Sequence, residues 1–120
     1  MMGPSTAAFS NRRLGILISG RGSNLQSIID AIARGDLDAS IPVVVSNRAE
    51  APGMLRAREA GIEAVHIPPR SHADRGEYDQ AIADCLRAHD VGLVCLAGFM
   101  RLVGPPLLKA FPHRIVPGIW

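Results

Sequence analysis

Cysteine is scarce in this sequence, no apolar run is long, and neither sign of charge dominates. Cys85 and Cys95 stand apart without a C-x-x-C pair, so we expect two reduced, buried thiols in a cytoplasmic protein rather than a disulfide or a metal site. No run approaches the ~20 apolar residues of a membrane span, and residues 1–12 lack the apolar centre of a signal peptide. We therefore expect a flexible tail at 1–12 and no membrane partner. The net charge of +2 is too small to favour a nucleic-acid partner.

The composition instead fits one globular domain, since 48% of the 120 residues are hydrophobic and 20% are charged. Apolar runs typical of buried strands alternate with helical patterns along the chain. This alternation predicts a three-layer, Rossmann-like α/β fold with an open and mainly parallel sheet. The predicted strands are 14–19, 41–46, 63–68, 91–98 and 113–116, and the predicted helices run from Ser23 or Asn24 to Gly35 and over 53–61, 74–89 and 104–111.

The segment SGRGSN joins the first predicted strand to the first predicted helix. In open parallel sheets this loop is a favoured ligand site, where backbone and the free N–H groups of the following helix approach an anion. The P-loop pattern is absent, and the dinucleotide pattern G-x-G-x-x-G keeps Gly20 and Gly22 but has Leu25 in its third place. A single phosphomonoester therefore fits better than a dinucleotide or ATP. The alternative is a tight turn in which Ser23 or Asn24 only caps the helix.

A second candidate segment, LAGFMRLVGP, ends the fourth predicted strand and would lie near the same edge of the sheet. It places Phe99 and Met100 beside Arg101, and apolar residues around one arginine suit a flat, partly polar ligand. The alternative is that Phe99, Met100 and Leu102 belong to the core while Arg101 is solvated.

A third candidate segment is SHADRGEYD, in which Arg75 or His72 would reach a ligand across a loop. The alternative is a helix start that carries a solvated charge cluster. The four histidines of the chain lie far apart and show no metal-ligand spacing, so no metal site is predicted.

Four stretches occur in the order found in one known family: ISGRGSNLQSIIDA, VVVSNRAEAPGMLRAREAGI, DRGEYDQAI and LVCLAGFMRLVGP. In these stretches the chain resembles the phosphoribosylglycinamide formyltransferase family, from about Arg13 to Val116, over roughly the first half of the family's domain. We therefore expect 13–116 to be the phosphate-binding half of a formyltransferase-type fold. The resemblance implies transfer of a formyl group from the co-substrate 10-formyltetrahydrofolate to glycinamide ribonucleotide, in de novo purine synthesis and without a metal.

The resemblance also implies roles for individual residues. Gly22, Ser23 and Asn24 would hold the phosphate of glycinamide ribonucleotide. Arg75 and the MRLV segment would border the site of the folate. The MRLV segment consists of Met100, Arg101, Leu102 and Val103.

The chain departs from the family at its carboxyl end, where it reads RIVPGIW in place of NIHPSLLP. Pro117 stands at the place of the family's catalytic asparagine and Ile119 at that of its catalytic histidine, while the catalytic aspartate would lie beyond the last residue. In the family these groups stabilise the transfer and move protons, which neither proline nor isoleucine can do. We therefore expect 117–120 to be a non-family tail, from a truncation or a frameshift, and the chain to be inactive alone.

Other interpretations stay open at this point. The chain could be a non-catalytic fragment that binds phosphate ligands, or a poorly folded, non-functional remnant of the enzyme. A nucleotide-dependent reductase is compatible with the predicted fold, although the missing third glycine of the dinucleotide pattern argues against it.

Overall fold

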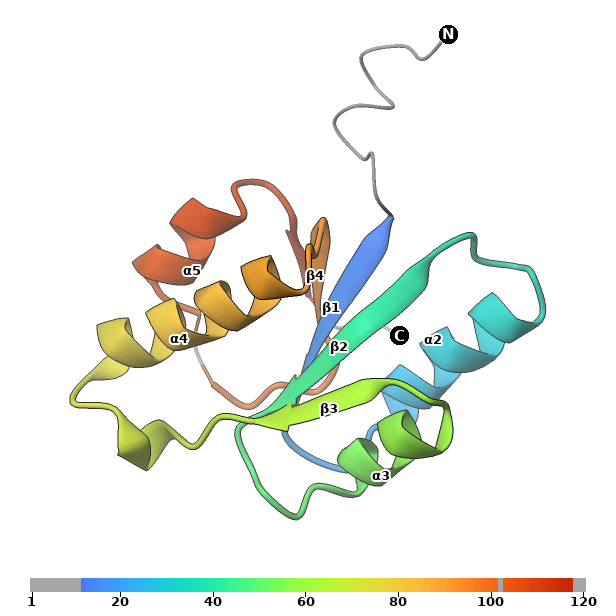
Figure 1. Cartoon of the computed structure of the whole chain (residues 1–120), viewed down its shortest axis with the longest axis horizontal. Helices are drawn as coiled ribbons and strands as arrows, with labels where there is room; N and C mark the ends of the chain where they lie inside the picture. The colour runs from blue at the N-terminus through green and yellow to red at the C-terminus, as the bar shows by residue number, and fades with distance from the viewer. Residues whose placement is uncertain (1–11, 102, 118–120) are drawn as a thin grey trace, which may run out of the picture.

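The computed structural model describes residues 12–101 and 103–117, which form one sheet flanked by helices (Figure 1). Its strands are hydrogen-bonded in the order β3-β2-β1-β4-β5, and every pair is parallel. The predicted α/β fold with an open parallel sheet is confirmed. The strands are β1 (Arg13–Ile18), β2 (Ser40–Ser46), β3 (Glu63–His66), β4 (Leu93–Leu96) and β5 (Ile115–Val116), and the helices are α2 (Ser23–Ala33), α3 (Pro52–Glu59), α4 (Arg75–Ala88), α5 (Pro105–Ala110) and the 3-10 turn η1 (Pro69–Ser71).

Helices cover both faces of the sheet, with α2 and α3 on one face and α4 and α5 on the other (Figure 1). Along β1, Ile16 and Ile18 belong to the apolar cluster beside α2 and α3, whereas Leu17 belongs to the cluster beside α4 and α5. Successive residues of a strand point to opposite faces, so a strand covered on both sides needs apolar residues at every position. This requirement explains the continuous apolar run of β1.

The strand order determines where a ligand can bind. From β1 the chain steps outward to β2 and β3, and then returns past β1 to β4 and β5. Right-handed crossovers in opposite directions place their helices on opposite faces of the sheet. The loop after β1 therefore leads to one face and the loop after β4 to the other, and a crevice opens between them at the carboxyl ends of the strands.

The predicted elements all occur, but several are shorter than their sequence patterns indicate. A fourth strand is predicted from residue 91, yet the N–H group of Val91 donates to the carbonyl of Leu86 at 3.1 Å, so Val91 closes the turn that follows α4 and does not start the strand. That strand also stops before Gly98, whose φ of 78° is left-handed. The fifth strand begins after His113, which has a φ of 59°, for the same reason.

Several predictions concern the ends of the chain and its thiols. Of the tail predicted at 1–12 only Arg12 is described, and of the tail predicted at 117–120 only Pro117.

Cys85 and Cys95 are free thiols; Cys95 is buried as predicted, whereas Cys85 is only half-buried. Among the described residues, no helix is long and apolar enough to cross a membrane.

Candidate functional site

The loop after β1 packs so closely against the start of α3 that Gly22 and Gly53 leave no room for a side chain. Gly22 has a left-handed φ of 80°, and a Cβ atom added there would lie 2.5 Å from the Cα atom of Gly53. The N–H group of Gly53 donates to the carbonyl oxygen of Gly20 at 3.0 Å and holds the two segments together. Position 22 therefore requires glycine both for its backbone conformation and for this close contact.

Helix α2 begins without a side-chain cap, so the predicted capping by Ser23 or Asn24 is wrong. The left-handed turn puts Gly22, which has no side chain, at the cap position, and the N–H group of Gln26 donates to the Gly22 carbonyl at 2.8 Å. The N–H groups of Ser23, Asn24 and Leu25 consequently have no carbonyl partner within the helix. These donors lie at the positive end of the helix dipole, which is the arrangement that binds a phosphate.

A pocket of about 400 Å³ opens beside this loop and is lined by residues 19–21 and 48–52. Arg21 and Arg48 bring positive charge to the pocket and Glu50 brings negative charge, and all three side chains are exposed. Below the loop, the Nε atom of Arg56 donates to the carbonyl oxygen of Arg21 at 2.8 Å. Arg56 thus fixes the backbone of the loop. Because the pocket carries charges of both signs, the start of α2 is a better site for an anion than the pocket is.

The loop after β4 is tied directly to the loop after β1. The backbone N–H group of Met100 donates to the Oγ atom of Ser19 at 2.8 Å, and Ser19 is only 1% exposed. The side chain of Met100 is 80% exposed, whereas Phe99 is half-buried against the cluster beside α4 and α5. The alternative that placed Met100 in the core is therefore wrong, because this backbone bond turns the side chain outward. Leu102 lies outside the described residues.

Arg101 packs against the first turns of α4 rather than extending freely into solvent. Its Cζ atom lies 4.9 Å from the centre of the Tyr78 ring, a cation–π contact. The Tyr78 hydroxyl donates to the carbonyl oxygen of Ile67 at 2.8 Å, and the ring of His72 meets that of Tyr78 edge-on at 5.6 Å. Burial raises the pKa of Tyr78 to about 12, so the phenol stays neutral and anchors the arginine.

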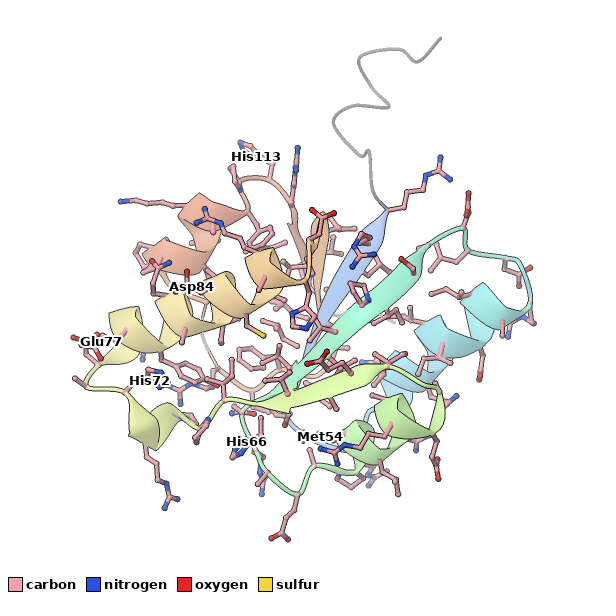
Figure 2. All side chains as sticks on the ribbon, in the orientation of Figure 1. Met54, His66, His72, Glu77, Asp84 and His113 are labelled. Carbon is pink, nitrogen blue, oxygen red and sulfur yellow. The ribbon has the colours of Figure 1, made fainter. Side chains whose placement is uncertain are left out.

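The start of α4 carries the third candidate segment on a well-formed cap. The N–H group of Glu77 donates to the Oδ1 atom of Asp74 at 2.9 Å, and the N–H group of Ala73 donates to the Oε1 atom of Glu77 at 3.2 Å. Asp74 thus caps the helix, and Glu77 accepts from the residue before that cap, so the helix starts at Arg75, whose side chain is exposed. Figure 2 labels His72 and Glu77 at this end of α4. The cap fixes the position from which Arg75 extends.

Asp79 links this helix to the end of the MRLV segment. Its Oδ2 atom accepts a hydrogen bond from the N–H group of Gly104, and the residue is 2% exposed. Burial raises the pKa of the carboxyl group above its ordinary value, while the Gly104 hydrogen bond and the charges of Arg75 and Arg101 act in the opposite direction. The two arginines, which come from separate sequence segments, therefore both act on one buried carboxyl group.

The structure thus brings most predicted site residues to the crevice edge of the sheet. Residues 19–22 and 97–101 are joined through Ser19, and the segment 72–79 lies against Arg101 and Gly104. Sequence reasoning missed Ser19, Tyr78 and Asp79. A signal was present for Asp79, because helical spacing puts it on the same face of α4 as the buried Ala83 and Leu86.

The fold and this edge define a Rossmann-like α/β protein with a candidate ligand site at the switch point of its sheet. Residues 12–117 match the family described as "Formyl transferase", and the chain belongs to that family. Phosphoribosylglycinamide formyltransferase of Haemophilus influenzae is 39% identical over 105 residues, which cover 88% of this chain and 50% of that protein. The human protein named "Trifunctional purine biosynthetic protein adenosine-3" is 40% identical over 104 residues, covering 87% of this chain and 10% of that protein.

Solved structures agree with these relatives. Glycinamide ribonucleotide transformylase 1 from Symbiobacterium toebii superposes with a TM-score of 0.86 at 50% identity, over 88% of this chain and 50% of that one. Phosphoribosylglycinamide formyltransferase from Brucella melitensis superposes with a TM-score of 0.84 at 33% identity, over 89% and 56% of the two chains. The resemblance drawn from the sequence motifs is confirmed. The chain spans about half the length of the bacterial relatives it matches.

Proposed function

We propose that this chain provides the ligand-binding loops of a phosphoribosylglycinamide formyltransferase. In that reaction the amine of glycinamide ribonucleotide attacks the formyl carbon of 10-formyltetrahydrofolate. The new carbon–nitrogen bond forms, the bond from the formyl carbon to the folate nitrogen breaks, and a proton passes from the amine to the released tetrahydrofolate. The named relatives support this reaction, and the two free thiols suit the reducing cytoplasm, in which we place it.

The start of α2 is our candidate seat for the phosphate of glycinamide ribonucleotide. The observation that carries this assignment is the left-handed Gly22 at the cap position, which leaves the N–H groups of Ser23 and Asn24 without a helix partner at the positive end of the helix dipole. Neither side chain is used as a cap, so the Ser23 hydroxyl and the Asn24 amide are left to contact the ligand. One phosphate on these donors satisfies the helix end that the fold leaves open.

The second loop and the start of α4 are our candidate border of the folate. Met100 offers an exposed apolar surface, and Arg101 and Arg75 offer positive charge near the same buried Asp79. The folate has a flat ring and a carboxylate-bearing tail. An exposed apolar side chain contacts the ring, and arginine side chains bind the carboxylates. Val103 lies half-buried beside them, and Leu102 is assigned to this border by its motif alone.

We further propose that the chain as given binds both ligands but does not transfer the formyl group. Pro117 and Ile119, at the places of the family's asparagine and histidine, carry no group that moves a proton, and each lost acid or base removes ~10²–10⁴ in rate. His113 does not replace them. It precedes β5 and so lies at the amino ends of the strands, whereas the candidate site lies at their carboxyl ends. Figure 2 shows His113 at the end of the sheet opposite to His72 and Glu77. The proposal therefore separates binding from turnover.

Calorimetry with glycinamide ribonucleotide tests the phosphate site. We expect the native chain to bind and Asn24→Ala to bind about tenfold more weakly, since a hydrogen bond to a charged group is lost. Ser27→Ala is the matched control, because the Ser27 hydroxyl donates only to the Ser23 carbonyl within the same helix at 3.2 Å. Equal affinities of the native chain and Asn24→Ala would argue against the loop assignment.

A turnover assay on the purified, mass-verified chain tests the separation of binding from transfer. We expect no formylated product above the rate without protein, together with a cooperative thermal unfolding transition. Measurable transfer would contradict the proposed inactivity. A broad, non-cooperative transition would favour the remnant interpretation over a folded binding domain.

A further inference from the structure

Asp79 is the only buried charged residue in the part of the chain that the structure describes, and neither ligand assignment gives it a role. It lies on the inner face of α4, next to the buried Tyr78. Its carboxyl group accepts a hydrogen bond from the N–H group of Gly104. That residue is the cap position of α5 and comes immediately after the MRLV segment. The bond therefore ties the end of this segment to the start of α4.

The contact leaves no room for any other residue at position 104. A Cβ atom added to Gly104 would collide with Oδ2 of Asp79 and would lie 3.9 Å from the Cδ atom of Arg75. Gly104 is itself buried. The carboxyl group, the glycine and the stem of Arg75 thus pack against one another, and loss of the Asp79 carboxyl group would release the Gly104 backbone from this contact.

The charges around Asp79 come from both sides of the candidate folate border. Arg75 is one helical turn before it on α4, and Arg101, which stacks on the ring of the adjacent Tyr78, acts on the Asp79 carboxyl group through its charge. The carboxylate therefore attracts both guanidinium groups toward the same point. Arg101, which stacks on an aromatic ring beside this carboxyl group, has fewer conformations to lose when a ligand binds.

Fold stability alone does not explain a carboxylate at this position. A buried charge loses its hydration, and apolar residues of similar volume in such places are often neutral or stabilising. The neighbouring inner positions of α4 are apolar, as in Ile82 and Ala83. The Asp79 carboxyl group lies among these apolar residues and accepts a hydrogen bond from a backbone N–H group. Its presence there fits a role in the adjoining candidate folate border.

We propose that Asp79 is a positioning residue, which fixes the backbone at Gly104, at the end of the MRLV segment, and orients the charges of Arg75 and Arg101 for the formyl donor. This inference rests on the proposed function of that segment. Asp79 touches no reacting atom; it acts through the Gly104 backbone and through the two arginines. The donor site would lose its shape without it, while the phosphate seat at Gly22 to Asn24 would not.

The test compares three variants of the full chain by calorimetry with 10-formyltetrahydrofolate and with glycinamide ribonucleotide. Asp79→Ala removes the acceptor of the Gly104 bond, Asp79→Asn keeps an acceptor oxygen, and Asp84→Ala removes an exposed carboxylate of the same helix that only accepts from Gln80. Figure 2 labels Asp84 on α4. We expect Asp79→Ala to bind the donor about tenfold more weakly, and Asp79→Asn, which keeps the Gly104 acceptor but loses the charge that attracts the two arginines, to lie between the native chain and Asp79→Ala. All three variants should bind glycinamide ribonucleotide as the native chain does.

A second measurement does not depend on any ligand. The amide proton of Gly104, followed by nuclear magnetic resonance, should shift as Asp79 titrates in the native chain and stay constant over the same pH range in Asp79→Asn. Loss of this amide's protection from hydrogen exchange is expected in Asp79→Ala and not in Asp84→Ala. If Asp79→Ala fails to fold, the comparison of the native chain with Asp79→Asn still decides whether the carboxyl group holds Gly104.

The outcomes separate the inference from the function on which it rests. A native chain that does not bind 10-formyltetrahydrofolate overturns the proposed function, and the positioning role with it. A native chain that binds the donor, together with Asp79→Ala that binds it equally well, overturns the positioning role alone. Equal weakening of both ligands in Asp79→Ala would show a general effect on the fold and would also overturn the positioning role.

Discussion

The backbone N–H group of Met100 donates to the Oγ atom of Ser19 at 2.8 Å, across 81 positions of sequence. This bond joins the loop after β1 to the loop after β4, and so connects the candidate phosphate seat to the candidate folate border. Ser19 is buried, so its hydroxyl does not exchange this partner for water. The two halves of the site are therefore one unit of the fold.

Replacement of Ser19 by alanine should destabilise the chain by about 0.5–1.5 kcal/mol, because the hydrogen bond that joins the two loops is lost. Urea unfolding of the native chain and of Ser19→Ala measures this loss. Ser27→Ala, which removes an exposed serine hydroxyl on α2, should change the free energy of unfolding by no more than about 0.5 kcal/mol. Equal effects of the two substitutions would mean that the bond between the loops contributes nothing.

Alanine substitutions at two glycines with similar backbone angles distinguish the cost of backbone strain from the cost of a steric contact. Gly22 has φ of 80° and Gly35 has φ of 83°, but a Cβ atom meets the Gly53 backbone at the first position and nothing within 4 Å at the second. Both alanine variants should lose about 1–2 kcal/mol to left-handed strain. Gly22→Ala should lose about 1–3 kcal/mol more from overpacking, measured by chemical unfolding. Identical losses would mean that the loop moves away from α3 without cost.

The sequence predicted the sheet better than it predicted the site. The apolar run of β1 and the helical spacing of α2 are local patterns, and the structure confirms both elements. The cap of α2 was wrong because a left-handed Gly22 moves the cap position one residue earlier, which the presence of Ser23 and Asn24 does not indicate. The structural roles of Ser19 and Asp79 depend on partners 81 and 25 positions away in sequence, and no local pattern carries such information.

The stability of the fold should depend on the protonation of His89, at the end of α4. Its Nδ1 atom lies 2.8 Å from the carbonyl oxygen of Cys85, and its Nε2 atom lies 3.2 Å from Oε1 of Glu63. Both ring nitrogens can donate only in the protonated form. The Cys85 carbonyl, and then Glu63, raise the pKa of His89 above its ordinary value of 6.5, while burial and Arg13 act against them.

A base whose pKa rises on folding stabilises the fold fully below its unfolded pKa, and this contribution is lost as the pH rises through the folded pKa. The native chain should therefore exceed His89→Ala in unfolding free energy most at pH values below 6.5, and by less as the pH rises above that value. Urea unfolding of both proteins at about pH 5.5 and about pH 8.5 measures the two differences. A difference that grows with pH would contradict the protonated contact.

The two thiols should differ in reactivity. Burial raises the pKa of Cys95 to about 11, and burial with the charge of Glu63 raises the pKa of Cys85. The thiolate is the reactive form, so both should react with iodoacetamide more slowly in the native chain than in urea, and Cys95 more slowly than the half-buried Cys85. Peptide mass spectrometry over time distinguishes them. Native labelling of Cys95 at the rate seen in urea would contradict its burial.

Tyr78 is the one tyrosine of the chain, so its ionisation can be followed directly by ultraviolet absorbance. Its pKa is raised from 10.0 to about 12 by burial, although the charge of Arg101 lowers it. An acid whose pKa rises on folding stabilises the fold fully below its unfolded pKa of 10.0, and this contribution is lost as the pH rises through the folded pKa of about 12. We therefore expect the phenol to remain neutral past pH 10 and to ionise near pH 12 or together with alkaline unfolding, followed in parallel by circular dichroism. Ionisation near pH 10.0 with an unchanged circular dichroism spectrum would mean that Tyr78 is not buried beneath Arg101.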